Sequence, residues 1–352
     1  MTRVLIVTSH PVSAPWDSAD KQIASVVIVQ LPQHRHIYFR RAGARTDLPA
    51  RGIPVVSRRG KPGGIERAQA ALLSVLLQPT VDIVHVVMSP GPGFAQLARL
   101  WRLVPSRLRR PLVYTIPGIL PDARFALREA DAHVVALSEP GADVLRGLGA
   151  RNVRVIPPGL DLDRWGVVAG RGEGILVAAH LERASALEET VEAVARVRID
   201  GRPPRLVLAL RHRARAAGGE AAALRRRAQL AGLDVEIVEE VRDMRPLIRG
   251  AAAVVYAPLD LAGKADIPLT LLEAMASGRP VITSDLPQLD ALGPSVVRVP
   301  RGDVTALAAA IQSLEDDAAW SSRVSSARAL VERRFSAAAA GRAYAELYSE
   351  IV

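Results

Sequence analysis

The segment Pro268–Ser284 reads PLTLLEAMASGRPVITS and combines a helix start with an acidic side chain. A helix is expected over Leu269–Ser277, because Gly278 and Pro280 end it and return the chain to a strand. The first N–H groups of a helix have no partner inside it, so a phosphate oxygen suits the start formed by Pro268, Leu269 and Thr270. Glu273 lies about one turn into the helix, where its carboxylate could accept two hydroxyl groups of the same ligand. An ordinary early-turn glutamate favoured by the helix dipole is the alternative.

Two loops carry further polar side chains. The segment LDLAGKADIP, residues 259–268, holds Lys264 between Asp260 and Asp266, and the lysine could bind a phosphate group. A solvated loop lysine is the alternative. The loop SHPVSAPWDSADKQ, residues 9–22, follows the first expected strand and reaches a helix start with the polar residues Ser18, Asp20 and Lys21.

Short apolar, β-branched runs alternate with segments of helical spacing along the chain. Strands buried on both faces read as such continuous runs, and their alternation with helices implies parallel crossovers. The strands expected in the N-terminal half are Val4–Thr8, His36–Phe39, Pro54–Ser57, Ile83–Val87, Leu112–Ile116, His133–Ala136 and Val153–Ile156. Those expected in the second half are Gly174–Ala179, Leu206–Leu210, Val235–Val238, Ala253–Tyr256, Pro280–Thr283 and Val296–Val299. The helices expected between them include Ile65–Leu77, Pro121–Glu129, Leu187–Arg198, Glu220–Ala231 and Met244–Arg249.

The alternation pauses at Pro157-Pro158-Gly159, and a helix cannot run through two prolines, so a domain boundary is expected there. The expected fold is α/β, with two Rossmann-like, doubly wound domains that face each other across a cleft. The first covers residues 1–158 and the second residues 159–335. Such sheets bind ligands beyond the carboxyl ends of their strands, so any chemistry belongs in that cleft.

Several segments, in the same order, resemble the family 4 glycosyltransferases of the GT-B fold. They are DAHVVALS at residues 131–138, IPPGLDLDRW at 156–165, the Pro268–Ser284 segment and DVTALAAAIQSL at 303–314. The resemblance implies a retaining transferase that uses a nucleotide-sugar donor and is largely independent of metal ions. It also implies an acceptor-side first domain, a donor-binding second domain and a contact between Glu273 and the nucleotide ribose. Residues 336–352 are then expected to form a C-terminal helix that crosses back to the first domain.

Several residues depart from the pattern of that family. Ala265 stands where the family has a second glutamate that holds the donor sugar, and His180 and Ser185 stand where it has two cations that neutralise the diphosphate. Val87 and Pro117 replace two expected histidines. Two unreplaced charge-assisted hydrogen bonds would cost about 3–6 kcal/mol, so an active enzyme needs substitutes. The candidates are His85, His180 and Arg183 as catalytic residues, with Lys264 and Lys21 as further cations.

The stretch Arg99–Arg110, RLWRLVPSRLRR, places arginines beside Leu100, Trp101, Leu103 and Leu108. An apolar edge next to a cationic edge is typical of segments that lie on a membrane surface. Members of the resembled family act on lipid-linked acceptors, so the stretch predicts weak docking at the inner face of a membrane. A surface helix followed by a loop is the alternative.

Composition limits the other functions. The chain has 352 residues, a formal net charge of +10 and no cysteine, so it has neither disulfides nor thiolate metal sites. Its seven histidines lack ligand spacing, so no metal ion is expected. No cofactor is expected either, with the nucleotide sugar as a co-substrate. Aromatic residues are few and no known binding motif accompanies the charge, which argues against nucleic acid. No run of roughly 20 apolar residues and no signal peptide is found, so a soluble, cytoplasmic protein is expected.

Two functional hypotheses remain at this point. The first is a retaining glycosyltransferase that moves a sugar from a nucleoside-diphosphate sugar to an unidentified acceptor. The second is a non-catalytic, glycosyltransferase-like partner subunit or binding protein, and the replaced donor-site residues motivate it.

Overall fold

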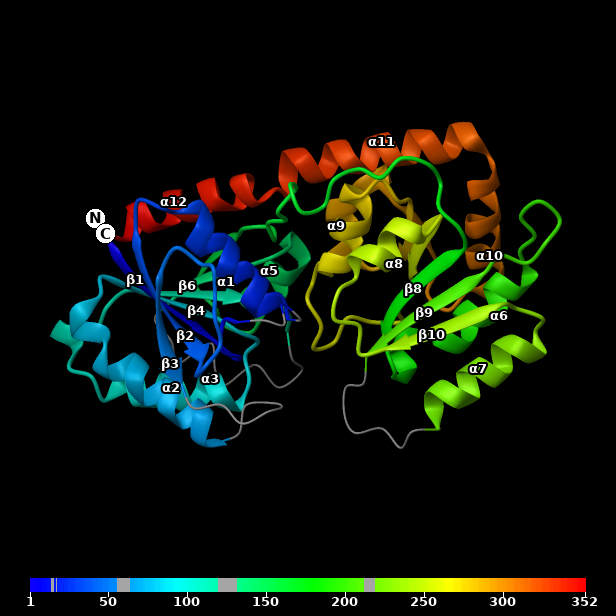
Figure 1. Cartoon of the computed structure of the whole chain (residues 1–352). Coiled ribbons are helices and arrows are strands. Elements are labelled where there is room, and N and C mark those ends of the chain that lie inside the picture. The colour runs from blue at the N-terminus through cyan, green and yellow to red at the C-terminus, as the bar shows by residue number, and fades with distance from the viewer. Residues whose placement is uncertain (14–15, 17, 56–63, 120–131, 212–218) are drawn as a thin grey trace. The chain divides into compact units, whose positions relative to one another are not determined.

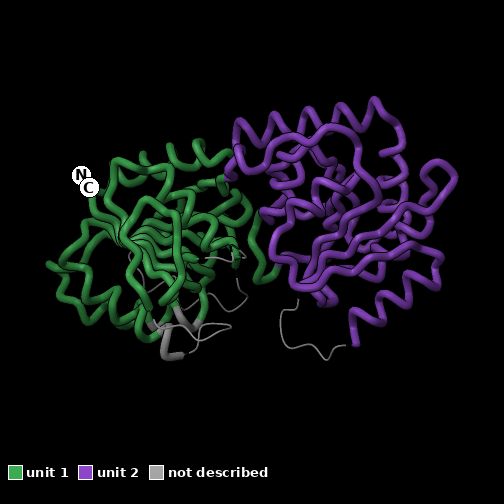
Figure 2. The backbone as a smooth tube through the Cα atoms, in the orientation of Figure 1, with its two compact units in different colours: residues 1–159, 262–267, 335–352 green, residues 160–261, 268–334 purple. Residues whose placement is uncertain are grey.

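The computed structural model of the chain describes residues 1–13, 16, 18–55, 64–119, 132–211 and 219–352. These residues form two compact units, each built on a parallel sheet covered by helices (Figure 1, Figure 2). Unit 1 comprises residues 1–159, 262–267 and 335–352, and unit 2 comprises residues 160–261 and 268–334. The first division therefore follows Gly159, next to the double proline.

The described part of unit 1 contains a seven-stranded parallel sheet in the order β3-β2-β1-β4-β5-β6-β7. Its strands are β1 (Arg3–Thr8), β2 (Arg35–Arg41), β3 (Arg51–Val55), β4 (Ile83–Val87), β5 (Leu112–Ile116), β6 (His133–Ala136) and β7 (Asn152–Val155). Its helices are α1 (Ala19–Gln30), α2 (Gly64–Leu76), α3 (Pro92–Arg102), α5 (Glu139–Gly147) and α12 (Ala337–Ile351). All residues of β4 and β5 are buried, which is why these strands read as continuous apolar runs.

The two faces of this sheet bury different helices because side chains alternate along each strand. Val4 and Ile6 of β1 pack with α1 and α12, which lie side by side on one face (Figure 1). Leu5 and Val7 point to the other face and pack with α2 and α3. The C-terminal helix α12 is thus part of the first unit's core.

The described part of unit 2 contains a six-stranded parallel sheet in the order β10-β9-β8-β11-β12-β13. Its strands are β8 (Ile175–His180), β9 (Leu206–Arg211), β10 (Val235–Glu239), β11 (Ala253–Tyr256), β12 (Val281–Ser284) and β13 (Val297–Val299). One face is covered by α6 (Leu187–Arg196), α7 (Glu220–Leu230) and α10 (Val304–Gln312). The helices α8 (Arg245–Gly250), α9 (Leu269–Ala276) and α11 (Asp317–Arg334) lie on the other face, where α9 packs on α11 (Figure 1).

Each sheet reverses its strand order at one point. In unit 1 the reversal lies between β1 and β4, and in unit 2 it lies between β8 and β11. The loops that leave two such strands diverge to opposite faces and open a crevice at the carboxyl ends, where α/β proteins bind ligands. The two crevices are therefore the first places to look for function.

A six-residue strap, residues 262–267, leaves unit 2 and packs into unit 1. The Gly263 N–H donates to the carbonyl of Ile119 at 3.0 Å, and the Asp266 N–H donates to that of Pro117 at 2.9 Å. The Ser138 hydroxyl donates to the Asp266 carboxylate at 3.0 Å while it caps α5 through the Gly141 N–H. The strap is held to the first unit by backbone and side chain together.

Substituting Gly118 with alanine is expected to loosen this strap. A Cβ at Gly118 would lie 1.8 Å from the carbonyl oxygen of Lys264, and neither backbone can move away without losing the strap's hydrogen bonds. We expect a loss of at least about 2 kcal/mol of unfolding free energy, measured by urea or thermal denaturation. Gly147→Ala is the control, because no atom lies within 4 Å of its added Cβ. Equal stability of the two variants would contradict the close approach.

The predicted strands agree with the observed ones to within a few residues, and the two-domain α/β fold class is confirmed. The largest shift is at β3, which was expected at Pro54–Ser57 and is observed at Arg51–Val55. β3 is the edge strand, where Pro54 is tolerated because one side of the strand needs no ladder donor. The helix expected at Pro121–Glu129 lies outside the described residues.

Candidate functional site

The strand order of unit 2 predicts a crevice between the loop that follows β8 and the loop that follows β11. The two loops meet at a backbone hydrogen bond, in which the Leu259 N–H donates to the carbonyl of Ala184 at 2.8 Å. The first loop leads through a short 3-10 turn, Arg183–Ser185, into α6, and the second leads into α9. Both helices therefore begin at the crevice.

Glu273 is a buried carboxyl group that has no hydrogen-bond partner among the residues the structure describes. Its residue is only 6 % exposed, and none of the residues that the structure describes donates a hydrogen bond to its side chain. Burial raises the pKa of Glu273 to about 7. Buried polar groups normally have partners, so an unpartnered carboxylate at a ligand-binding edge marks a place where a ligand can supply them.

Charged side chains from neighbouring loops act on Glu273. Arg164 and Arg211 favour its ionised form, whereas Asp243 opposes ionisation. Asp243 is itself held by Arg245 on α8, with its carboxylate 2.7 Å from the guanidinium. Arg211 ends β9, so it lies at the carboxyl edge of the same sheet. The sequence argument missed both arginines, although Arg164 lies within the IPPGLDLDRW segment.

The two helix starts at this crevice differ in charge. The first turn of α6 carries Glu188 and Glu189, which compensate the positive end of the helix dipole and repel an anion. The first turn of α9 carries no acidic residue, and no side chain caps its N-terminus at Pro268. A phosphate group would therefore bind at α9 in preference to α6.

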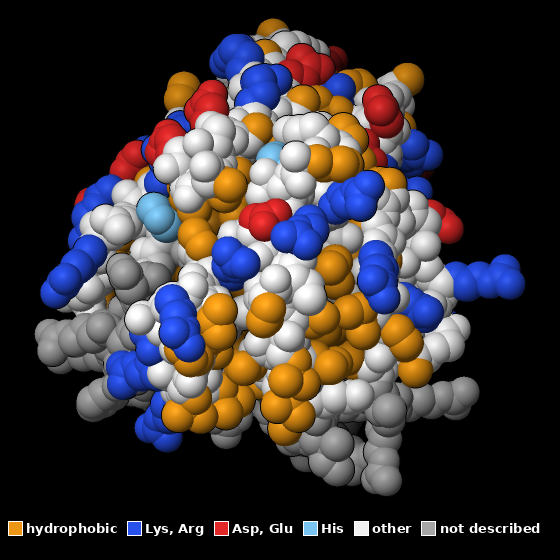
Figure 3. All heavy atoms as spheres, turned by 90° about the vertical axis from the view of Figure 1, so that its left-hand side faces the viewer, with side chains coloured by type: hydrophobic (Ala, Val, Ile, Leu, Met, Phe, Trp, Pro, Cys, Tyr) orange, Lys and Arg blue, Asp and Glu red, His pale blue; other side chains and the backbone are white. Residues whose placement is uncertain are grey.

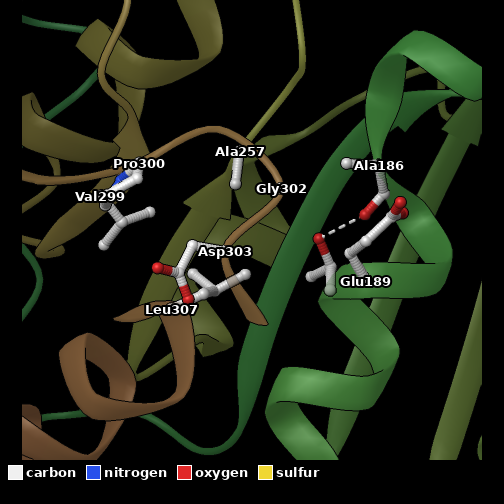
Figure 4. Close-up of a pocket in the computed structure, with 9 residues that line it drawn as sticks. Ala186, Glu189, Ala257, Val299, Pro300, Gly302, Asp303 and Leu307 are labelled. Carbon is white, nitrogen blue, oxygen red and sulfur yellow. Dashed lines mark hydrogen bonds between the residues drawn. The ribbon is translucent and has the colours of Figure 1, made fainter. Parts of the chain in front are cut away.

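Figure 4 shows a small pocket at the same edge of the sheet, between the starts of α6 and α10. Glu189 lines it from α6, and Asp303, which caps α10, lines it from the other side. The Thr190 hydroxyl donates to the Ala186 carbonyl at 2.8 Å and so is not available to a ligand. Two carboxylates line this pocket, and its one hydroxyl already donates its proton to a backbone carbonyl. The pocket therefore does not suit an anionic ligand.

The comparisons with known proteins agree with this geometry. Family models described as "Glycosyltransferase Family 4" and "Glycosyl transferases group 1" match residues 25–164 and 172–317 respectively. Crystal structures of similar fold include Anabaena HepE in complex with UDP and glucose, with a TM-score of 0.76, 16% identity and coverage of 99% of this chain and 100% of that one. The chain is a family 4-like glycosyltransferase of the GT-B fold.

Two further solved structures show the same fold. Sucrose-phosphate synthase from Thermosynechococcus elongatus matches with a TM-score of 0.74, 18% identity and coverage of 99% of both chains. A glycosyltransferase from Rickettsia africae matches with a TM-score of 0.73, 16% identity and coverage of 99% of this chain and 98% of that one. No curated protein matches the sequence.

The residues at and near the positions of the missing cations differ in burial and in ion pairing. His180 is half-buried at the last position of β8, and Ser185 is buried with a hydroxyl that has no partner among the described residues. Arg183 is exposed and forms an ion pair with Glu189 at 2.5 Å. Because its charge is already neutralised by that carboxylate, Arg183 is a weak candidate for a phosphate ligand.

Lys264 and Asp266 are not part of unit 2, where the nucleotide was expected to bind. Both are buried in the strap that packs into unit 1, and Asp266 is bonded to Ser138. Burial raises the pKa of Asp266 to about 6, and the hydrogen bond from Ser138 only partly offsets that rise. We therefore leave these two residues out of the proposed donor site. Ala265, which lies between them, belongs to the strap as well.

His85 is enclosed in the core of unit 1 and does not reach a crevice. It is fully buried, with Nδ1 2.6 Å from the Tyr348 hydroxyl and Nε2 2.8 Å from the Thr115 hydroxyl. Both ring nitrogens are thus occupied, and α12 covers them. His85 has no surface with which to meet a substrate, so we assign it a packing role.

The polar loop residues of unit 1 lie at the other crevice. Asp20 and Lys21 are buried in the first turn of α1, and Ser18 is the N-cap residue of that helix. The backbone N–H of His10 and the side chain of Ser9 both donate to Asp20.

Among the described residues, no three histidine, cysteine or acidic side chains gather as a metal site would need. None of the described helices is both long and apolar enough to span a membrane.

Proposed function

We propose that this glycosyltransferase transfers a sugar, with retention, from a nucleoside-diphosphate sugar to a hydroxyl acceptor. The observation that carries the proposal is Glu273, a buried carboxyl group one turn inside an uncapped helix of unit 2. It has no hydrogen-bond partner in the described part of the chain. A ribose supplies two hydroxyl donors and a diphosphate supplies oxygens for the helix start. One nucleotide diphosphate would therefore satisfy both features.

The reaction needs the bond between the sugar carbon and the diphosphate oxygen to break. Its electron pair stays with the diphosphate, so the transition state is stabilised by donors that are already aimed at the phosphates. The N–H groups at the start of α9 supply such donors, and Arg211 and Arg164 supply positive charge nearby. These two arginines would take the place of the family's missing cations, which the sequence could not locate.

Binding of UDP is the first test. The crystal structures of Anabaena HepE contain UDP or UDP-glucose, so we choose uridine nucleotides first and then other nucleoside diphosphates. A ligand at a hundred times its dissociation constant stabilises the protein by about 2.7 kcal/mol, which thermal denaturation detects readily. A flat response to every nucleotide and nucleotide sugar would favour the non-catalytic alternative. Retention is tested by the anomeric configuration of the product in an NMR spectrum.

We further propose that unit 1 docks on an anionic membrane and that the acceptor is lipid-linked. Exposed leucines occur on α2 and after α3, two helices that pack together, and Arg110 binds the Gln78 backbone just beyond α2. Figure 3 shows hydrophobic and basic side chains on this side of unit 1, with acidic ones sparse in its lower half. The exposed leucines are Leu72, Leu76, Leu103 and Leu108, and the arginines beside them are Arg99, Arg102, Arg107, Arg109 and Arg110.

Sedimentation with vesicles tests this docking. Binding to phosphatidylglycerol vesicles is expected at low salt and should weaken as salt rises, because each basic residue near an anionic surface contributes about 1 kcal/mol. Leu103→Asp with Arg107→Glu should reduce binding. Leu230→Asp is the matched control, since Leu230 is 80% exposed but belongs to unit 2. Absence of binding to anionic vesicles at low salt would remove the membrane from the proposal.

A further inference from the structure

A pocket of about 530 Å³ lies within unit 1, at the carboxyl end of β2 and next to the edge strand β3. These two strands are parallel neighbours, and residues 42–50 alone connect them (Figure 1). Parallel strands are usually joined by a longer crossover that contains a helix. Here a short loop crosses the sheet instead, and the pocket lies between that loop and the two strands. Its volume is within the range of sites that bind small molecules.

The loop over this pocket is fixed to the strands. The Ala42 N–H donates to the carbonyl of Val55 at 3.0 Å, and the hydroxyls of Tyr38 and Thr46 share a hydrogen bond. Leu48 packs against the core on the face of the sheet that α12 covers. The pocket is therefore formed before any ligand arrives, and a ligand need not order the loop in order to bind.

Arg40 is a half-buried arginine whose position is set by uncharged partners. Its Nε donates to the carbonyl of Gly52 at 3.3 Å, and its Nη1 donates to that of Ala44 at 2.9 Å. Gly52 leaves room for this arrangement, because a Cβ there would lie 2.7 Å from the Cδ of Arg40. A guanidinium carries five N–H donors, so three of them remain for a ligand.

The positive charge at this pocket is not compensated by the residues that line it. Arg40 and Arg45 both line the pocket, and neither forms an ion pair within the described part of the chain. The one carboxylate in the lining, Asp47, is paired with neither of them. A cation that has lost part of its hydration is stabilised by a counter-charge, so the pocket favours an anionic ligand.

We propose that this pocket binds a phosphorylated sugar, with the phosphate group at Arg40 and Arg45 and a sugar hydroxyl at Asp47. Two guanidinium groups donate to phosphate oxygens from different directions, and a carboxylate accepts the proton of a hydroxyl. A bare phosphate ion would fill only a small part of the volume, whereas a hexose phosphate makes use of the carboxylate as well. All lining residues belong to unit 1, so the inference goes beyond the proposed nucleotide site of unit 2 and does not depend on it.

Calorimetric titration of the full chain with glucose 6-phosphate and glucose 1-phosphate at low salt is the test. At least one of them should bind more tightly than glucose, inorganic phosphate or glucuronate. Arg40→Gln and Arg45→Gln should each weaken that binding roughly ten- to a hundredfold. Arg45 is exposed, so its substitution should leave the melting temperature unchanged. Gly52→Ala should also weaken binding, because it displaces Arg40 without altering any charge.

Arg35→Gln is the matched control, because Arg35 is an exposed arginine at the first position of the same strand. It removes the same charge from unit 1 and should leave the affinity unchanged. Glu273→Gln, which alters the proposed nucleotide site, should bind the sugar phosphate as the wild type does. Binding should also persist when UDP is present in excess.

Several results would overturn the inference. One is that neither sugar phosphate binds, and another is that inorganic phosphate or glucuronate binds as tightly as they do. Equal affinity of the wild type, Arg45→Gln and Gly52→Ala would place the ligand outside this pocket. Loss of binding in excess UDP or in Glu273→Gln would place it at the nucleotide site of unit 2. Binding that needs Arg45 and persists in UDP supports the inference, whether or not the protein transfers a sugar.

Discussion

Glu273→Gln is expected to make the ligand-free protein more stable at pH 8 and, at the same time, to weaken its binding of UDP-glucose. Burial raises the pKa of Glu273 from 4.5 to about 7, so the folded state holds this proton more tightly than the unfolded state does. The unfolding free energy therefore falls as pH rises from 4.5 to about 7. Above that range the ionised carboxylate costs on the order of 3 kcal/mol, which a neutral glutamine does not.

The same substitution removes the negative charge and replaces one of the two acceptor oxygens, which the ribose hydroxyls require, by an NH2 donor. A charge-assisted hydrogen bond contributes about 1.5–3 kcal/mol, so affinity should fall roughly ten- to a hundredfold. UDP-glucose is the appropriate probe, because its diphosphate has no proton to lose near pH 7, whereas the terminal phosphate of UDP does. Wild-type affinity should also decline as pH falls below about 7, where Glu273 becomes protonated. The affinity of the glutamine variant should not change over that range.

Thermal denaturation at pH 5 and pH 8, together with calorimetric titration of UDP-glucose, checks both expectations. Glu173→Gln is the control, since Glu173 is an exposed glutamate of the same unit. An unchanged melting temperature at pH 8 would show that Glu273 is not desolvated as the structure indicates. Unchanged affinity for a nucleotide sugar that the wild type binds would place the ribose elsewhere.

Unit 1 is expected to lose stability steeply in mild acid because it buries neutral histidines beneath α12. Burial lowers the pKa of His36 to about 4 and that of His85 to about 3, with the charge of a neighbouring histidine as the smaller cause for each. The unfolded state binds protons at about 6.5, before the folded state does. The unfolding free energy should therefore fall, as pH drops from 6.5 towards 4, by about 1.4 kcal/mol per pH unit for each histidine.

His85 is the more informative of the two histidines. Its two ring nitrogens form hydrogen bonds with the Tyr348 and Thr115 hydroxyls, and Thr115 in turn contacts the Tyr344 hydroxyl at 3.0 Å. Because both tyrosines belong to α12, protonation of His85 disturbs the packing of that helix. Urea denaturation at several pH values is the measurement. His36→Gln and His85→Gln should each flatten the acid dependence relative to the wild type, even where they lower stability at pH 7. His133→Gln, which lies at a partly exposed strand start, should keep the wild-type slope. Parallel slopes for all four proteins would contradict the prediction.

The strands of both sheets could be predicted because burial on two faces leaves a direct trace in the sequence. β4 and β5 are buried throughout, so most of their positions are apolar. The place of Glu273 within its helix could also be predicted, because Pro268 and Gly278 mark the ends of that helix. Short-range sequence signals were sufficient for both the strands and this helix.

The residues that were misplaced depend on contacts between distant segments. Lys264 follows β11 of unit 2 in the sequence. Its strap nevertheless belongs to unit 1, where backbone hydrogen bonds join it to Pro117 and Ile119. His85 was a candidate because it lies two residues before Val87, the position of a histidine in the family, yet α12, more than 200 residues later, covers that face.

The order of the segments has a consequence for biosynthesis. All residues of unit 2 lie between Leu160 and Arg334, so they are synthesised before α12. Unit 1 begins the chain but waits for its final helix, since Tyr344, Leu347 and Tyr348 belong to the core around β1. The first-made half thus finishes last, and a nascent chain that stalls before Phe335 leaves an apolar face of its first sheet open to chaperones.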